Sequence, residues 1–426
     1  MVRRAPFSDN PNVGARGQRT QQRILDAALR VFGEVGYDRC SIDSITRVAG
    51  CSRVSFYQYF SGKQDVFRHL AGLVARQLDA STERLDPITP DRSGWASARA
   101  WVERYGEIYE RYEPVFHAFA AAAESDAALL VDSVGTATRS VSGIRARVEG
   151  AELRPGDLDP VIQLSSESLT RTLDHSAVLR HAMGNALPLP AILDAFTDVV
   201  HRTLFGLVAD ANVHRRGPAG RRPPRLPFGP VMRTALDTGA DPSAGSRGGP
   251  APAALLEAGR RVFVTRGLHG TRVDNIVDAA GLSHGTFYRY FRSKEELALL
   301  LAVAAMHTVS TTFTDMPDLT DAGATGRTSL RRWLRAYNRA QMDETAMIRV
   351  WADAALQDAR LRDDSASVTD WGRRRLAHAL RFRDFGDPEV DAVVLLSVID
   401  AFGVHPRTPA LMNAAVHIIE RGFLGR

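Results

Sequence analysis

Two eight-residue segments carry polar side chains whose types suit contact with an anionic, hydrogen-bonding partner. They read Ser-Arg-Val-Ser-Phe-Tyr-Gln-Tyr at 52–59 and Ser-His-Gly-Thr-Phe-Tyr-Arg-Tyr at 283–290. Their hydroxyl, guanidinium and imidazole groups can donate hydrogen bonds to phosphates, and an arginine can also bind guanine through two parallel hydrogen bonds. The segments share a framework of Ser, Phe and Tyr but differ in the groups that would make such contacts.

Both segments lie inside a longer internal repeat. Residues 24–67 align with residues 255–298 without a gap, at an offset of 231, and 16 of the 44 positions are identical. The chain has 52 arginines and two lysines, and the two lysines, Lys63 and Lys294, occupy the same repeat position. A lysine kept twice in so arginine-rich a chain indicates a specific role for that position.

Hydrophobic periodicity predicts the same helices in each copy. In the first copy the expected helices span 24–32, 43–49, 52–59 and 63–84, with glycine breaks at Gly36 and Gly50. In the second they span 252–266, 274–280, 283–290 and 294–313, with breaks at Gly267 and Gly281. Two short helices separated by a glycine turn are typical of the DNA-reading helix-turn-helix. We call each such copy a head.

The second copy resembles the signature of the tetracycline-repressor (TetR) family. The resemblance lies in Ala-Gly-Leu-Ser-His-Gly-Thr-Phe-Tyr-Arg-Tyr-Phe-Arg-Ser-Lys-Glu-Glu-Leu at 280–297. The first copy, at 49–66, is similar but has Val54 and Ser55 in place of Gly and Thr, and Gly62 and Gln64 in place of Ser and Glu. These departures leave the expected fold intact and bear only on the DNA contacts of the first head.

The resemblance implies a DNA-binding face on each head. It places Tyr57 and Tyr288 at the DNA surface, Lys63 and Lys294 on phosphates at a helix start, and Arg53 and His284 at base edges. The further implied contacts are made by hydroxyl groups and by two more polar tips: Ser52, Ser55, Gln58, Ser283, Thr286 and Arg289. An N-terminal arm with Arg3, Arg4, Arg16 and Arg19 is expected to enter the minor groove.

Other residues of the heads have simpler interpretations. The aromatic residues expected in the core rather than at DNA are Phe32, Tyr59, Phe60, Phe263, Tyr290 and Phe291. Cys40 and Cys51 align with a threonine and a leucine, which favours packing over redox sensing. Asp43 and Asp274 could accept a hydrogen bond from cytosine, but an acid that helps to start a helix explains them more simply.

Composition and charge fit a cytoplasmic, DNA-binding protein. Residues 1–67, 212–249 and 250–297 carry net charges of +4, +5 and +2, so the rest of the chain must carry −6 to give the total of +5. Concentrated positive charge favours a polyanionic partner, although basic tails can simply be solvated. No signal peptide is recognised at the start, and the longest apolar run, 297–306, is half of what a membrane span needs.

The repeat and the composition divide the chain into six parts. These are a basic arm at 1–19, a helix-turn-helix domain at 20–67, a helical regulatory domain at 68–211, a Pro/Gly/Arg-rich linker at 212–250, a second helix-turn-helix domain at 251–298 and a second regulatory domain at 299–426. The predicted fold is all-α, with two tandem TetR-like units.

The family resemblance implies a ligand pocket and a dimerisation bundle beyond each head. The aromatic candidates for a small-molecule effector pocket are Trp101, Tyr105, Phe116 and Phe119 in the first half, and Trp333, Tyr337 and Trp351 in the second. Residues 158–183 and 188–211 are expected to pair with 389–404 and 408–423 in one four-helix bundle, which makes the chain a pseudo-dimer. A homodimer of chains is the alternative.

The predicted function is a transcriptional regulator, most simply a repressor released by an effector, in which one chain reads two non-identical half-sites. No metal or cofactor is expected. Two alternatives stay open: an all-helical enzyme, and a sensor or scaffold with one degenerate head. Against an enzyme, no nucleophile-elbow, dinucleotide-binding, phosphate-loop or zinc spacing is found, and His175 and His181 have no further ligands near them.

Overall fold

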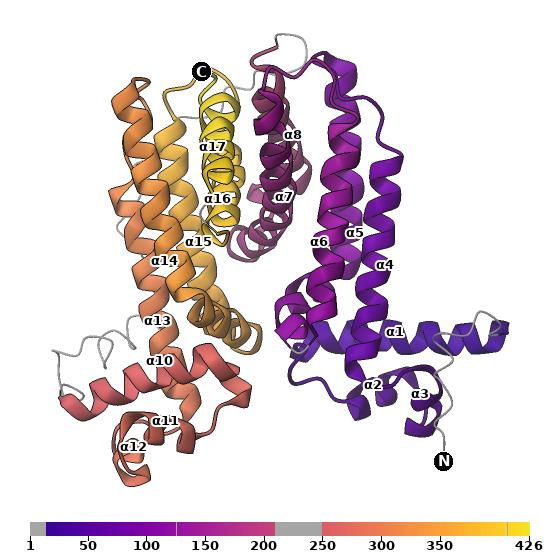
Figure 1. The fold of residues 1–426 in the computed structure, drawn as a ribbon, viewed down its shortest axis with the longest axis vertical. Helices are drawn as coiled ribbons and strands as arrows, with labels where there is room; N and C mark the ends of the chain where they lie inside the picture. The colour runs from indigo at the N-terminus through magenta and orange to yellow at the C-terminus, as the bar shows by residue number, and fades with distance from the viewer. Residues whose placement is uncertain (1–13, 125, 209–248, 407) are drawn as a thin grey trace. The chain divides into compact units, whose positions relative to one another are not determined.

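The computed structural model describes residues 14–124, 126–208, 249–406 and 408–426, and within these ranges it contains helices and no strand (Figure 1). The all-α prediction is confirmed. Arg3, Arg4 and the linker predicted at 212–250, except for its last two residues, lie outside the described residues. Helix α1 (Ala15–Val35) begins earlier than expected, so Arg16 and Arg19 belong to this helix and not to an N-terminal arm.

The first head contains α1, α2 (Ile42–Ala49), α3 (Arg53–Tyr59) and the start of α4 (Lys63–Glu83). Local sequence sets the ends of these helices. Gly36 and Gly50 have φ values of +79° and +61°, a region that glycine enters without steric cost, and so both end their helices where expected. Ser52 starts α3 because its side chain accepts a hydrogen bond from the Ser55 amide at 3.1 Å.

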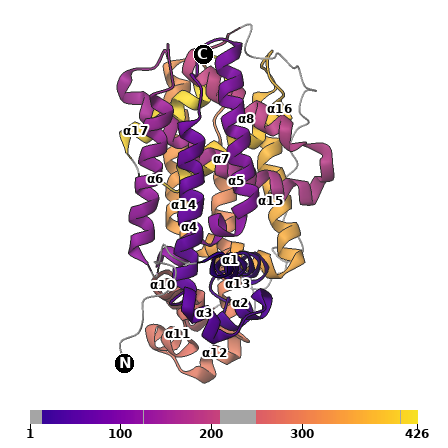
Figure 2. The same ribbon diagram turned by 90° about the vertical axis from the view of Figure 1, so that its right-hand side faces the viewer.

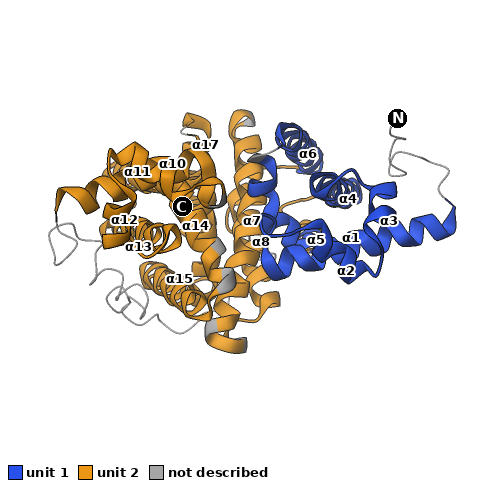
Figure 3. Cartoon of the chain, turned by 90° about the horizontal axis from the view of Figure 1, so that it is seen from below, with its two compact units in different colours: residues 1–87, 100–148 blue, residues 88–99, 149–426 orange. Residues whose placement is uncertain are grey.

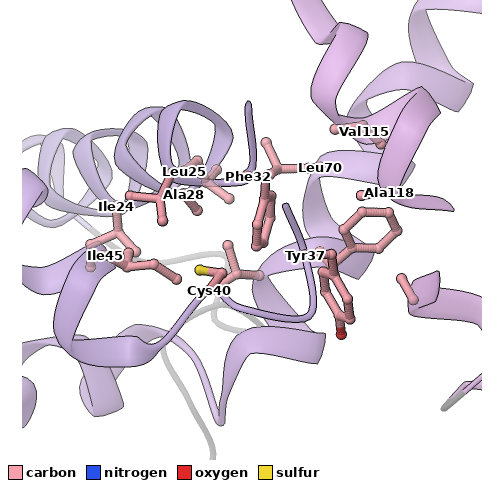
Figure 4. Packing of buried hydrophobic residues seen from close by; sticks show 14 of the residues in the cluster. Ile24, Leu25, Ala28, Phe32, Tyr37, Cys40, Ile45, Leu70, Val115 and Ala118 are labelled. Carbon is pink, nitrogen blue, oxygen red and sulfur yellow. The ribbon is translucent and has the colours of Figure 1, made fainter. Parts of the chain in front are cut away.

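A single apolar core holds the first head together (Figure 4). Ile24, Ala28 and Phe32 of α1 meet Ile45 of α2, and all four side chains are almost completely buried. Phe56 and Phe60 close the core from α3 and from the residue after it. The core also contains Cys40, and burial raises the pKa of this thiol, as expected for a packing residue rather than a reactive one.

The second head repeats this arrangement with α10 (Pro250–Gly270), α11 (Val273–Ala280), α12 (His284–Tyr290) and α13 (Lys294–Thr312). Gly281 has φ +65° and separates α11 from α12, and Ser283 caps α12 as Ser52 caps α3. Residues Lys294–Asp315 form the one described helical stretch long and apolar enough to cross a membrane. Leu297, Leu301 and Val303 of this stretch are buried in the core of the head, which is the usual situation of a core helix in a soluble protein.

The chain divides into two compact units (Figure 3). Unit 1 comprises residues 1–87 and 100–148, and it contains the first head, most of α5 (Arg92–Glu124) and α6 (Ala127–Arg145). Within it, α6 packs along α4 (Figure 2). Helix α5 is kinked at Tyr112, two residues before an internal proline, Pro114, which cannot donate the usual helical hydrogen bond.

Unit 2 comprises residues 88–99 and 149–426. It contains α7 (Pro155–Met183), η2 (Gly184–Ala186), α8 (Leu189–Phe205), the second head, η4 (Phe313–Asp315), α14 (Ala324–Gln357), α15 (Ala359–Leu380), α16 (Pro388–Gly403), α17 (Pro409–His417) and η5 (Ile418–Phe423). Helices from both halves of the sequence therefore fold into this one unit.

A helical bundle within unit 2 joins the two halves of the sequence. Helix α7 packs against α16 and α17, and α8 packs against α16 and η5. Buried Arg202 of α8 donates from Nε to the Gly422 carbonyl oxygen at 2.8 Å, and Arg421 forms an ion pair with Glu152 at 2.6 Å. His175 of α7 shares a hydrogen bond with the hydroxyl of Ser397 at 3.0 Å. The segments expected to pair across the two halves of the sequence therefore do pack together within one chain.

Candidate nucleic-acid interface

Helices α3 and α12 expose the polar side chains that sequence analysis selected. Arg53, Gln58, His284 and Arg289 are exposed, and Tyr57 and Tyr288 keep 41% and 58% of their surface accessible. These exposed positions are set by helical spacing, because Phe56 and Phe287 are fully buried and turn the opposite faces of α3 and α12 outward. Each head therefore presents a short polar helix on an apolar support.

Short hydroxyl groups begin each of these helices. Ser283 accepts a hydrogen bond from the Thr286 amide at 3.2 Å, as Ser52 does from that of Ser55. Ser55 and Thr286 are half-buried, whereas the two capping serines are exposed. An N-cap hydroxyl can still donate to an acceptor outside the protein, since capping uses the oxygen as an acceptor.

The aromatic residues assigned to the core are placed as expected, with one difference. Phe32, Phe60, Phe263 and Phe291 are at most 3% exposed, and Tyr59 is buried. Tyr290 is only half-buried.

Each candidate base reader contacts an aspartate of the helix before it. Arg53 Nε lies 2.6 Å from Asp43 Oδ1, and His284 Nε2 contacts Asp274 Oδ1 at the equivalent place in the second head. The four side chains remain more than half exposed. Asp43 and Asp274 lie in the first turns of α2 and α11, as predicted. Their contacts with Arg53 and His284 were not predicted. The identity of Asp43 and Asp274 across the repeat was the signal that could have revealed them.

Lys63 and Lys294 face the interior of their heads. Lys63 Nζ donates to the Tyr37 carbonyl oxygen at 2.8 Å and to that of Asp38 at 3.4 Å, and it lies 4.2 Å from the centre of the Tyr37 ring. Lys294 Nζ donates to the carbonyl oxygen of Leu268 at 2.9 Å and to that of Thr271 at 2.7 Å. Each ammonium thus uses two of its three donors on the turn before α2 or α11. Its assignment to phosphates stays a prediction, and any such contact depends on the third donor.

The departures of the first head from the family signature leave its geometry intact. Gly62 lacks a side chain to cap α4, but Asp65 Oδ2 accepts hydrogen bonds from the amide and hydroxyl of neighbouring Ser61 at 2.8 and 3.2 Å. Val54 is 73% exposed on α3, where α12 has Gly285. The departure from glycine at Val54 places two exposed methyl groups on this face, and such groups can contact a thymine methyl group.

The aromatic pocket candidates of the first half only partly come together. The Trp101 and Tyr105 rings lie 5.7 Å apart, and Phe116 lies 6.3 Å from Tyr105 across the kink of α5. Trp101 Nε1 is buried without a hydrogen-bond partner among the described residues. Phe119 instead packs against Phe67 of the first head, with ring centres 6.4 Å apart.

The corresponding residues of the second half are buried and hydrogen-bonded. Trp333 donates to the Thr312 carbonyl oxygen at 2.7 Å, Tyr337 donates to Asp400, and Trp351 donates to the Ser365 hydroxyl at 2.7 Å. Trp333 and Tyr337 stack with ring centres 5.9 Å apart, whereas Trp351 packs into the core of the second head. These contacts are those of core residues, and the role of either aromatic group in an effector pocket stays a prediction.

Comparison with known proteins matches both heads to one family. The family model described as bacterial regulatory proteins, tetR family, matches residues 24–70 and 255–301. The regulator SrpR of Pseudomonas putida is 43% identical over 63 residues, which are 15% of this chain and 29% of SrpR. The repressor Rv1474c of Mycobacterium tuberculosis is 28% identical over 92 residues, 20% of this chain and 49% of its own.

A longer match covers most of a single relative. The uncharacterised regulator Mb2936c of Mycobacterium bovis is 26% identical over 181 residues, which are 42% of this chain and 88% of Mb2936c. Five curated regulators are at least 30% identical to this chain over the matched residues. The match covers only 25% to 47% of the length of each of them. The family model itself is matched within the two heads.

Proposed function

We propose that this chain, whose two heads match the family model of bacterial regulatory proteins, tetR family, is a cytoplasmic transcriptional repressor that reads one asymmetric operator with its two heads. The proposal depends on one observation: α3 and α12 are equivalent helices in the two heads, but they expose different polar side chains. Arginine and glutamine are exposed on α3, and histidine and arginine on α12. A homodimer of chains with one head each presents two identical recognition helices and so binds a palindrome. The two different helices of this chain suit two different half-sites.

We assign the DNA contacts by the chemistry of the exposed groups. Arg53, Gln58, His284 and Arg289 contact base edges, and Tyr57, Tyr288 and the hydroxyl groups of the recognition helices contact the backbone. The bundle of α7, α8, α16 and α17 supports reading by a single chain, because it supplies within one polypeptide the pairing that a dimer would otherwise need. A small apolar effector near Trp101 and Tyr105 would act as the releasing signal.

Selection from a random double-stranded DNA library tests the proposal with the full chain. The enriched sequences should contain two different half-sites whose centres lie about one helical turn, or a multiple of it, apart. The double variant Arg53→Ala/His284→Ala is the control and should enrich no such motif. Failure of the wild-type chain to enrich any sequence would exclude sequence-specific reading. Enrichment of a single half-site would instead identify one degenerate head.

A further inference from the structure

Asp43 and Asp274 stand at equivalent places on the DNA-facing side of the two heads. Each follows the first residue of the helix before the recognition helix, and each contacts the first residue of the recognition helix itself. The partner differs, arginine in one head and histidine in the other, but the acid and its contact are the same. A carboxylate at this face has to come close to DNA phosphates, which disfavours it by like-charge repulsion.

Folding stability of the free protein does not explain why an aspartate stands at both positions. Both pairs are more than half exposed, and exposed ion pairs contribute little to folding because water screens them. An acid at a helix start is favourable, but the same benefit is available from positions that do not face the next helix. The contact gains importance only when DNA excludes water and the orientation of the reader decides which base is bound.

We propose that Asp43 and Asp274 are positioning residues that hold Arg53 and His284 in the orientation that reads DNA. The proposal rests on the DNA-reading function proposed above. In the first head, Asp43 engages Arg53 through Nε, which leaves the two terminal nitrogens, Nη1 and Nη2, to bind O6 and N7 of one guanine. Without the carboxylate the flexible side chain has many rotamers to lose before it can make this contact.

The second head uses the same device with a different reader. Asp274 faces Nε2 of His284, and so Nδ1 is the ring nitrogen left for DNA. Two neighbouring groups have other contacts. Tyr288 lies one turn further along α12, with ring centres 6.4 Å apart, and Arg261 of α10 donates to the Ala279 carbonyl oxygen at 3.2 Å. The carboxylate therefore sets which edge of the imidazole meets a base.

Two matched variants of the full chain test the proposal, because each head serves as the control for the other. Asp43→Asn and Asp274→Asn keep the size of the side chain and remove its charge. Each variant is compared with wild type by selection from the random DNA library and by binding to the enriched site with every base pair substituted in turn. Asp43→Asn should lower the preference for one guanine by at least about threefold and leave the other half-site unchanged. Asp274→Asn should do the reverse.

A double-mutant cycle separates positioning from direct reading. On an Arg53→Ala background, Asp43→Asn should change base preference no further, because its effect acts through Arg53. Losses at two different base pairs that simply add would show that Asp43 reads a base itself and would overturn the proposal. If Asp43→Asn changes the thermal midpoint of unfolding but not the base preference, the acid only stabilises the start of its helix. That result would also overturn the proposal. If the wild-type chain enriches no sequence, the proposed DNA-reading function itself is wrong, which is a different outcome from failure of the positioning role.

Discussion

Gly422 of η5 lies so close to Thr203 of α8 that a Cβ on residue 422 would stand 2.5 Å from the Thr203 hydroxyl oxygen. The carbonyl oxygen of Val199, one turn earlier on α8, would be 2.9 Å away. The backbones of the two halves of the sequence thus meet without intervening side chains at this point. The Arg202 hydrogen bond to the Gly422 carbonyl oxygen depends on the same close approach.

Gly422→Ala should therefore force α8 and η5 apart and destabilise the bundle by about 1–3 kcal/mol, the usual cost of overpacking a tight contact. The measurement is urea unfolding followed by circular dichroism. Gly156→Ala in α7 is the matched control, since a Cβ there meets nothing within 4 Å. Equal stability of the two variants would contradict the close approach of the two halves.

Asp198 of α8 should make stability depend on pH. Burial raises the pKa of this carboxyl to about 6, against the opposing effects of Arg202 and of the Trp95 hydrogen bond at 2.7 Å. The folded state then binds the proton more tightly than the unfolded state, whose pKa is about 4, so the free energy of unfolding falls as pH rises from about 4 to about 6. The shift corresponds to at most about 3 kcal/mol, which stays lost at higher pH.

Asp198→Asn should remove this dependence and keep an acceptor for Trp95. Urea unfolding of wild type and variant between pH 4 and 8 measures the effect. The variant should gain stability relative to wild type as pH rises through this range. Parallel curves for the two proteins would show that Asp198 titrates alike in the folded and unfolded states.

Lys63→Ala should lower the thermal midpoint of unfolding of the first head, because the Tyr37 and Asp38 carbonyl oxygens lose a charged donor. It should also weaken binding to all DNA sequences alike, since a loosened turn displaces the whole recognition helix. Lys294→Ala makes the same test in the second head. An unchanged midpoint with a salt-dependence slope reduced by about 1 would identify Lys63 as a pure phosphate ligand.

Binding to the selected operator should depend steeply on salt. If the two heads make about six to ten phosphate contacts, affinity should fall on the order of a thousandfold or more between 50 and 200 mM salt. Fluorescence anisotropy with the labelled operator measures this slope. A nearly flat dependence would contradict a two-headed contact with the DNA backbone.

One chain should occupy one operator. Light scattering of the free protein and of its complex should give one protein chain per DNA duplex. Footprinting on operators with each half-site substituted in turn should show that Arg53→Ala abolishes discrimination in one half-site only, at a cost of about 1–3 kcal/mol. Two chains bound to a strictly palindromic site would contradict the pseudo-dimer as the reading form.

The amino-acid sequence by itself determined the heads. Helix starts and ends depend on neighbouring residues, and so glycines at 50 and 281 and serines at 52 and 283 located the turns and recognition helices. The resemblance to a family signature then placed Tyr57 and Tyr288 at the surface, and the phenylalanines were assigned to the core. The 44-residue repeat, whose copies lie 231 residues apart, established that the chain carries this arrangement twice.

Only the tertiary structure decided how distant residues meet. The directions of Lys63 and Lys294 toward backbone carbonyls depend on how helices cross, which local spacing does not encode. The contacts of Asp43 with Arg53 and of Asp274 with His284 depend on it in the same way. The same holds for the bundle, where Arg202 finds its acceptor 220 residues further along the chain. The sequence indicated which helices would pair, but buried polar groups found their partners only when packing excluded water.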